Sequence, residues 1–192
     1  MEESINNSNI DNSLSSKDTE SSIIYENKKI KDFNIDEQII NSIVLNLQEI
    51  IEENKYKARK DIFYLSNIPS ISLIDYIKRI MKYTKMDISS LIIAIIYIDS
   101  FCNINKYILT QNNIYTILLS ACLISIKFNE DIIVNFKRYS EIAGISIDFL
   151  KKLEFQMYLM LHFSLRVQHD IYKSYYDYFS NYSIPIIKNI NN

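Results

Sequence analysis

Two ionisable residues lie inside apolar stretches of this sequence, and their opposite charges suggest a pair held for a purpose. Lys127 lies near the end of the apolar stretch 118–128, and Glu154 lies within the stretch 149–159. A charged side chain flanked by core-type residues is costly to bury without a partner. The chemistry open to such a pair is charge-assisted hydrogen bonding, in which the ammonium group donates and the carboxylate accepts.

Each of the two residues also has a simpler interpretation, and the spacing alone leaves both open. A lysine near a helix end is often solvated, with its aliphatic stem lying over the core. Glu154 stands three residues after Lys151, the spacing of an ion pair on a single helix. Lys127 and Glu154 are therefore candidates for a binding pair, and ordinary surface charges remain the alternative.

The other reactive residue types occur without the neighbours that catalysis or metal binding needs. His162 and His169 have no cysteine or carboxylate at ligand spacing. Cys102 and Cys122 lie in apolar pattern without a CxxC motif, so we expect small buried hydrophobes. Since no nucleophile, phosphate loop or carboxylate pair emerges, the sequence indicates a protein that is not an enzyme. We expect no catalytic residue, metal, cofactor or small-molecule substrate.

The composition predicts one all-α domain. The chain has 192 residues but only one glycine and two prolines, and tight hairpins and phosphate-binding loops both draw on glycine. A formal net charge of −2 provides no electrostatic footprint for nucleic acid. The N-terminus lacks the apolar core of a signal peptide, and the run 91–98 is shorter than the ~20 residues of a membrane span. We therefore expect a protein of the cytoplasm, the nucleus or both, without a membrane or nucleic-acid partner.

Hydrophobic spacing divides the chain into four parts. Residues 1–34 are expected to form a disordered polar tail, and residues 35–65 an amphipathic helix and a linker. Residues 66–168 are the compact part, and residues 169–192 a final helix and tail. Within the compact part the pattern predicts five helices near 72–82, 91–101, 110–128, 139–143 and 146–162.

Several small polar residues and the single glycine predict where these helices begin and end. Asp87 or Ser89 is suited to cap the second helix, and Ser146 the fifth. Gly144 fits the left-handed position that stops the fourth helix. The aromatic stripe of the last helix is interpreted as core packing rather than as a second binding face; its members are Tyr172, Tyr175, Tyr176 and Phe179.

Short motifs in the compact part resemble the cyclin box, in the order and at the spacing of that family. Ala94 to Asp99 reads A-I-I-Y-I-D, and Leu109 to Ile114 resembles L-T-x-x-N-I. The stretch 120–131 ends in K-F-N-E-D, and Leu153-Glu154 is followed by F-S-L at 163–165. The opening I-P-S-I-S at 68–72 and the stretch 135–144 are similar to single-box cyclins of the P or U type, typified by the fungal phosphate-pathway regulator.

This resemblance implies a regulatory subunit that forms a heterodimer with a cyclin-dependent serine/threonine kinase and activates it by positioning the kinase's regulatory helix. By resemblance, Lys127 and Glu154 hydrogen-bond backbone groups of the kinase. An apolar pocket beside them would receive an isoleucine of the regulatory helix; its predicted residues are Ile124, Phe128, Tyr158, Phe163 and Leu165. A role in cell division and one in phosphate or nutrient sensing both remain open.

The sequence departs from the family pattern at three places, one of them near Tyr115 and Thr116, where the family commonly has arginine. Ser100 stands where the family usually has arginine after Y-I-D, and no arginine occurs near 69–73, where the mitotic cyclins carry a substrate-docking patch. Two other functions are weighed against kinase activation: a cyclin-box scaffold without a kinase, and an interaction protein of the transcription machinery. The net charge of −2 argues against the transcription-associated function.

Overall fold

The computed structural model describes residues 35–55, 60–131 and 135–181. The chain divides into two compact units, Met1–Glu37 and Gln38–Asn192. Of the first unit only residues 35–37 are described, so the described fold is that of the second unit. The tail predicted for 1–34 and the end of the chain after 181 lie outside the described residues.

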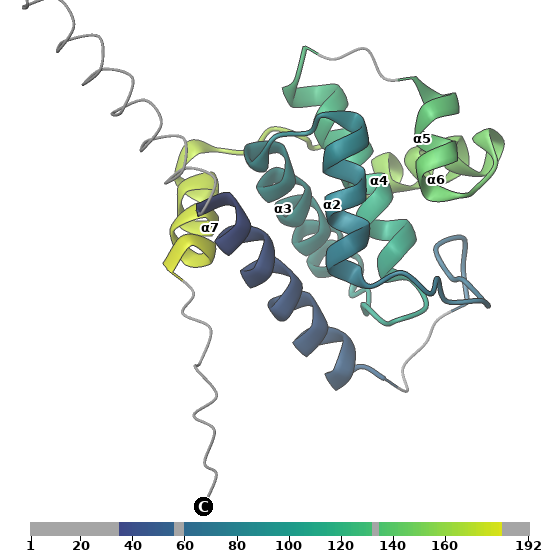
Figure 1. The fold of residues 1–192 in the computed structure, drawn as a ribbon, viewed down its shortest axis with the longest axis horizontal. Coiled ribbons are helices and arrows are strands. Elements are labelled where there is room, and N and C mark those ends of the chain that lie inside the picture. Colours follow the sequence, from purple (N-terminus) through teal and green to yellow (C-terminus); the bar gives the residue numbers. More distant parts are fainter. Residues whose placement is uncertain (1–34, 56–59, 132–134, 182–192) are drawn as a thin grey trace, which may run out of the picture. The chain divides into compact units, whose positions relative to one another are not determined.

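The described residues form helices and no strand, which confirms the all-α prediction. After a helix that covers residues 38–53 of this unit, the elements are α2 (Leu73–Thr84), α3 (Ile88–Asn105), α4 (Ile114–Asn129), α5 (Phe136–Ala143), α6 (Ile147–Met160) and α7 (His169–Asn181). The five helices of the predicted compact part are α2 to α6. They are flanked by one helix on each side in the sequence (Figure 1).

The predicted caps explain where three of these helices begin or end. Asp87 caps α3 by accepting a hydrogen bond from the backbone of Ser90, and Ser146 caps α6 by accepting from that of Phe149. Gly144 follows α5 with φ of +68°, a left-handed conformation that costs glycine little. Local sequence therefore determines the boundaries of α3, α5 and α6.

The start of α4 differs from the prediction of Thr110 or Asn112. The helix begins after Asn113, whose side chain makes no capping bond to the helix. It accepts instead from the backbone of Thr110 at 2.8 Å and donates to the carbonyl of Ile108 at 2.9 Å. Asn113 thus builds the turn before α4, and this turn sets the helix start.

Helix α4 is the centre of the core. All of its residues from Ile114 to Ile126 are buried, and it packs against α3, α6 and α2. Figure 1 shows α3 and α6 on opposite sides of it. Because a helix that is apolar on all sides is buried on all sides, α4 holds its last turn, which carries Lys127, in a fixed position against α6.

Helix α3 is long and apolar enough, by length and composition, to cross a membrane. Half of its residues are buried inside the fold, where they face α4, α6 and α7. Its apolar character is therefore that of a core helix.

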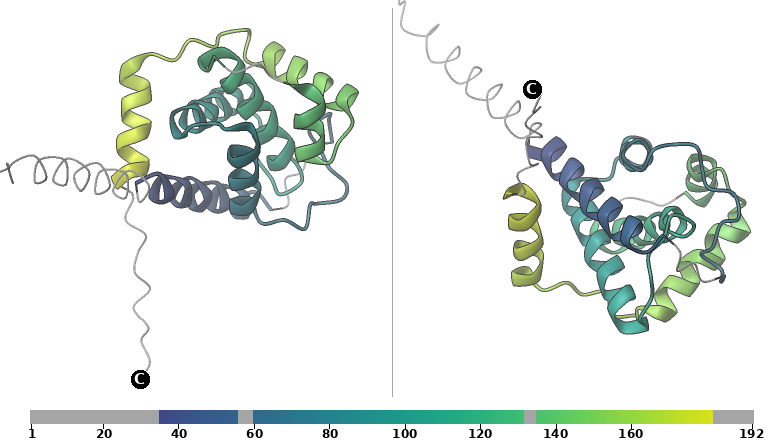
Figure 2. Two further views of the ribbon diagram at one scale, coloured as in Figure 1. Left: turned by 45° about the horizontal axis from the view of Figure 1, so that its top comes forward. Right: turned by 90° about the horizontal axis from the view of Figure 1, so that it is seen from below.

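Helix α7 and the 38–53 helix lie beside α3 (Figure 2). The side-chain amide of Gln38 donates to the carbonyl of Ser180 at 2.7 Å. Phe179 is buried, whereas Tyr172, Tyr175 and Tyr176 are partly exposed. The aromatic stripe of α7 is thus core packing at Phe179 and a partly open surface elsewhere.

Candidate functional site

The two charges singled out in the sequence meet across the α4–α6 contact. Lys127 lies in the last turn of α4, and its ammonium Nζ is 2.5 Å from Oε1 of Glu154 in α6. The Lys127 side chain is 26% exposed and that of Glu154 only 10%. Glu154 is thus paired with Lys127 and not, as its spacing also allowed, with Lys151. The ion pair stands at the border between core and solvent, where water screens it only partly.

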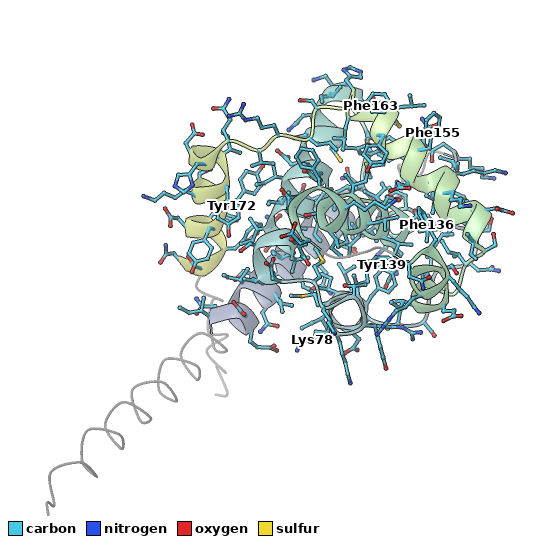
Figure 3. The ribbon with its side chains drawn as sticks, turned by 90° about the horizontal axis from the view of Figure 1, so that it is seen from above. Lys78, Phe136, Tyr139, Phe155, Phe163 and Tyr172 are labelled. Carbon is cyan, nitrogen blue, oxygen red and sulfur yellow. The ribbon has the colours of Figure 1, made fainter. Side chains whose placement is uncertain are left out.

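An aromatic ring from a third helix completes the setting of Lys127. The ammonium lies 4.1 Å from the ring centroid of Phe136, the first residue of α5. The ammonium of Lys151 is 5.8 Å from the same centroid. Phe136 lies where α5 meets α6 (Figure 3). The ring face attracts a cation, so Phe136 helps to orient Lys127 toward Glu154. Nothing in the sequence pattern singled out this residue.

The five apolar residues predicted beside the pair fall into two groups. Phe128 and Phe163 are 56% and 61% exposed, and Tyr158 is partly exposed. Leu165 is nearly buried at 9%, and Ile124 has no exposed surface. Ile124 is therefore a core residue in this structure, and its contact with a partner stays a prediction. Of the other residues, Tyr158 and Phe163 lie together, with ring centroids 6.1 Å apart.

The exposed position of Phe163 results from an abrupt stop of α6. His162 and Phe163 both adopt left-handed conformations, with φ of +51° and +56°. The backbone of Phe163 donates to the carbonyl of Tyr158 at 3.0 Å, and the two rings stack with centroids 6.1 Å apart. Left-handed residues other than glycine are uncommon and cost about 1–3 kcal/mol each. Surrounding contacts must therefore hold this turn in place.

Two hydrogen bonds from α3 supply that support. The hydroxyl of Tyr97 donates to the carbonyl of Leu165 at 2.7 Å. The amide of Asn105 donates to the carbonyl of Met160 at 2.9 Å. These two hydrogen bonds hold the backbone before and after Phe163 against α3. Tyr97 belongs to the Y-I-D motif. The sequence pattern assigned it no role in holding this segment, although a phenol within an apolar run is the kind of residue that needs a hydrogen-bond partner when it is buried.

The phenols around the site are kept protonated by burial. Burial raises the pKa of Tyr97, and a hydrogen bond from Asn129 opposes this shift. Burial also raises the pKa of Tyr158, and the negative charge of Glu154 raises it further. At neutral pH both hydroxyl groups therefore remain neutral, and Tyr97 remains a donor.

The structure also places the two histidines and the two cysteines. His162 and His169 are exposed. Burial raises the pKa of both Cys102 and Cys122 to about 12, so both stay as thiols at neutral pH. Among the described residues, no three His, Cys, Asp or Glu side chains come together in a way that could hold a metal ion.

Chemically, the site can bind polar backbone groups beside an apolar surface. The Lys127 ammonium has three donors, of which Glu154 accepts one. Within the described part of the chain no donor reaches Oε2 of Glu154. Donor and acceptor capacity therefore remains next to the exposed rings of Phe128 and Phe163.

Comparison with known proteins agrees with these motifs. The family model described as Cyclin matches residues 3–165. Cyclin-U2-2 of Arabidopsis thaliana is 29% identical over 119 residues, which cover 62% of this chain and 52% of the relative. Cyclin-P3-1 of Oryza sativa subsp. japonica is 27% identical over 128 residues, or 67% of this chain and 54% of the relative. PHO85 cyclin-7 of Saccharomyces cerevisiae is 27% identical over 117 residues, or 55% and 41%.

The chain therefore spans about half the length of the curated relatives it matches. These relatives carry the names of P-type, U-type and PHO85 cyclins, in agreement with the subclass that the motifs predicted. The matched residues 3–165 make up most of the chain and include both Lys127 and Glu154. On this ground, and on its five-helix core, the chain belongs to the cyclin family.

Proposed function

We propose that this chain is a regulatory subunit that binds a cyclin-dependent serine/threonine kinase and activates it by positioning the kinase's regulatory helix. The observation that carries the proposal is the Lys127–Glu154 ion pair, which stands at the surface with unused hydrogen-bonding capacity. Exposed Phe128 and Phe163 lie on the two segments that flank it, the ends of α4 and α6.

The polar part of this surface suits a partner's backbone. Helix ends and loops expose N–H and C=O groups that have no partner within their own segment. A carboxylate accepts from such N–H groups, and an ammonium donates to such C=O groups, in charge-assisted hydrogen bonds. Because Lys127 and Glu154 are already held together by α4, α6 and Phe136, little side-chain entropy is lost when they bind.

The apolar part of the surface supplies the driving force. Phe128 and Phe163 expose more than half of their area to water. Burial of apolar surface contributes about 25 cal/mol per Å², and aromatic residues are common among those that dominate interfaces. Ile124, one helical turn before Phe128, and Leu165, two residues after Phe163, are buried, so both rings stand on segments that pack into the core.

Activation would follow from a change in the kinase's conformational population. A protein kinase is active when the ion pair between its β3 lysine and its regulatory-helix glutamate is in place. A partner that binds this conformation more tightly than the alternative shifts the equilibrium toward it. The chain would contribute no catalytic group of its own.

A capture experiment tests this function. The tagged chain is incubated with lysate of the organism that encodes it, bound kinases are identified by mass spectrometry, and the kinase found is assayed with purified chain. We expect a cyclin-dependent kinase to be retained and its activity to rise. Retention of no kinase, or of a kinase whose activity does not change, contradicts the proposal.

Single substitutions assign the effect to the site. Lys127→Ala and Glu154→Ala should each weaken kinase retention at least tenfold while circular dichroism at 222 nm stays unchanged. The matched control is the exposed ion pair Lys55–Glu52, whose atoms are 2.9 Å apart. Lys55→Ala and Glu52→Ala should leave retention intact. If helicity is lost together with binding, the pair is structural and the contact assignment fails.

A further inference from the structure

A cavity of about 530 Å³ lies away from the ion pair, among the 38–53 helix, α3, the turn after α3 and α7. Figure 2 shows these helices side by side. Its deep wall consists of buried apolar residues from three of these elements, such as Leu47, Ile98 and Phe179. The volume falls within the ~300–1,000 Å³ that is usual for small-molecule sites. A cavity of this size is large enough for an organic molecule with one ring system.

Asp99 is the one charged residue among those that line this cavity. Its Oδ2 accepts from the hydroxyl of Tyr175 at 2.7 Å and from the amide of Asn103 at 3.1 Å. No described residue donates to its other oxygen, Oδ1. The carboxylate is thus held in one orientation by α3 and α7, with an acceptor position left for a further donor.

The neighbours of Asp99 keep the cavity's charge at one negative unit. Burial raises the pKa of Tyr175, and the hydrogen bond and charge of Asp99 raise it further. Burial likewise raises the pKa of Cys102 to about 12, with Asp99 adding to the shift. Both groups are therefore neutral at pH 7, and no cation among the lining residues neutralises the carboxylate.

We infer that this cavity binds a small organic cation, an amine that carries an aromatic or branched apolar body. The apolar body would occupy the wall formed by Leu47, Ile98 and Phe179, and the ammonium would donate to Asp99. An anion of the same shape would meet an uncompensated like charge, and a neutral molecule would lose the charge-assisted bond. This inference does not depend on the proposed kinase contact, since none of the cavity's lining residues belongs to that site.

Three compounds that share one apolar body and differ in charge provide the test: 4-phenylbutylamine, 4-phenylbutan-1-ol and 5-phenylpentanoate. Each is titrated calorimetrically into the full chain at pH 7, where an alkylamine is protonated. We expect the amine to bind about tenfold more tightly than the alcohol, and the acid to bind more weakly than both. Equal affinities, or no binding of the amine at millimolar concentration, overturn the inference.

Two variants locate the binding site. Asp99→Asn keeps an acceptor for Tyr175 but removes the charge, so the preference of about tenfold for the amine over the alcohol should disappear. The matched control is Asp177→Asn, an exposed aspartate of α7 that does not line the cavity, and it should keep that preference. Ser174→Trp places a large ring at the exposed rim and should abolish binding of the amine and of the alcohol alike. A preference that survives Asp99→Asn, with the fold verified by thermal melting, contradicts the assignment.

Discussion

Tyr97 of α3 donates a hydrogen bond of 2.7 Å to the carbonyl oxygen of Leu165, which lies 68 positions later in the chain. This bond joins the buried centre of the fold to the segment that presents Phe163. Because His162 and Phe163 adopt left-handed conformations, this segment needs an anchor on the side of the core. The Y-I-D motif therefore has a structural reason: its phenol holds the end of the candidate binding surface.

Removal of this hydroxyl tests the anchor. Tyr97→Phe should lower the free energy of unfolding by about 1–2 kcal/mol, since a buried carbonyl loses its donor. It should also weaken kinase binding, because Phe163 is no longer held in one place. Urea unfolding and a binding titration measure the two effects. Tyr83→Phe is the control, since Tyr83 is 46% exposed, and its effect on stability should stay within about 0.5 kcal/mol. Equal effects of the two substitutions contradict the role given to Tyr97.

Alanine substitutions of Ile124 and Phe128, two α4 residues of the expected pocket, should affect stability and kinase binding in opposite ways, because Ile124 is buried and Phe128 is exposed. Ile124→Ala leaves a cavity in the core and should destabilise the fold by about 2–5 kcal/mol. Phe128→Ala removes an exposed ring and should change stability by less than about 0.5 kcal/mol. Phe128→Ala should nevertheless weaken kinase binding roughly tenfold, as for a residue that dominates an interface. Thermal denaturation and binding titration together separate the two roles; a stable Ile124→Ala protein contradicts the structure.

The ring of Phe136 gives a finer test of how Lys127 is oriented. Phe136→Leu keeps an apolar residue but removes the attraction between ring and ammonium, which is worth about 0.5–1 kcal/mol at a partly exposed site. Kinase binding should weaken about two- to fivefold. Phe136→Tyr keeps a ring face and should bind as the original chain does. The dissociation constants of the Phe136→Leu and Phe136→Tyr variants for the kinase are compared. Equal weakening by both variants rules out the cation–ring contact as the cause.

The cysteine pKa values predict how stability depends on pH. The pKa of Cys122 is raised from 9.0 to about 12 by burial, so the folded state holds its proton more tightly than the unfolded chain does. Its contribution to stability is complete below pH 9 and is lost as the pH rises toward 12. At pH 10 we expect a loss on the order of 1 kcal/mol. Urea unfolding at pH 7 and pH 10 should show a smaller decrease for Cys122→Ala than for the original chain. An equal decrease for both proteins refutes the shift.

Local signals in the sequence predicted the helices well, and contacts distant in sequence account for the rest. Asp87, Ser146 and Gly144 act within four residues of their own positions, so their roles are readable from neighbours. The start of α4 was misplaced because the side chain of Asn113 bonds backward to the turn before the helix. Ile124 was assigned to the pocket by family resemblance, and the pattern of an apolar helix that is buried on every side does not reveal which neighbour covers which face.

The candidate site also combines residues that local sequence reveals with residues that only contacts distant in sequence reveal. Lys127 and Glu154 stood out as charges in apolar stretches, and the structure brings them together. The contributions of Phe136 and Asn105 remained hidden, because each depends on how α5 or α3 meets α6. A phenylalanine that opens a short helix, or an asparagine that ends a long one, has no distinctive local pattern.

An exchange of the two charges tests the central claim most directly. In the double variant Lys127→Glu/Glu154→Lys, an ion pair forms again across the α4–α6 contact, so helicity and melting temperature should remain close to those of the original chain. Kinase binding and activation should nevertheless be lost, because a donor would face the partner's N–H groups and an acceptor its carbonyl groups. A well-folded double variant that activates the kinase as the original chain does would contradict the account, since the pair would then be only structural.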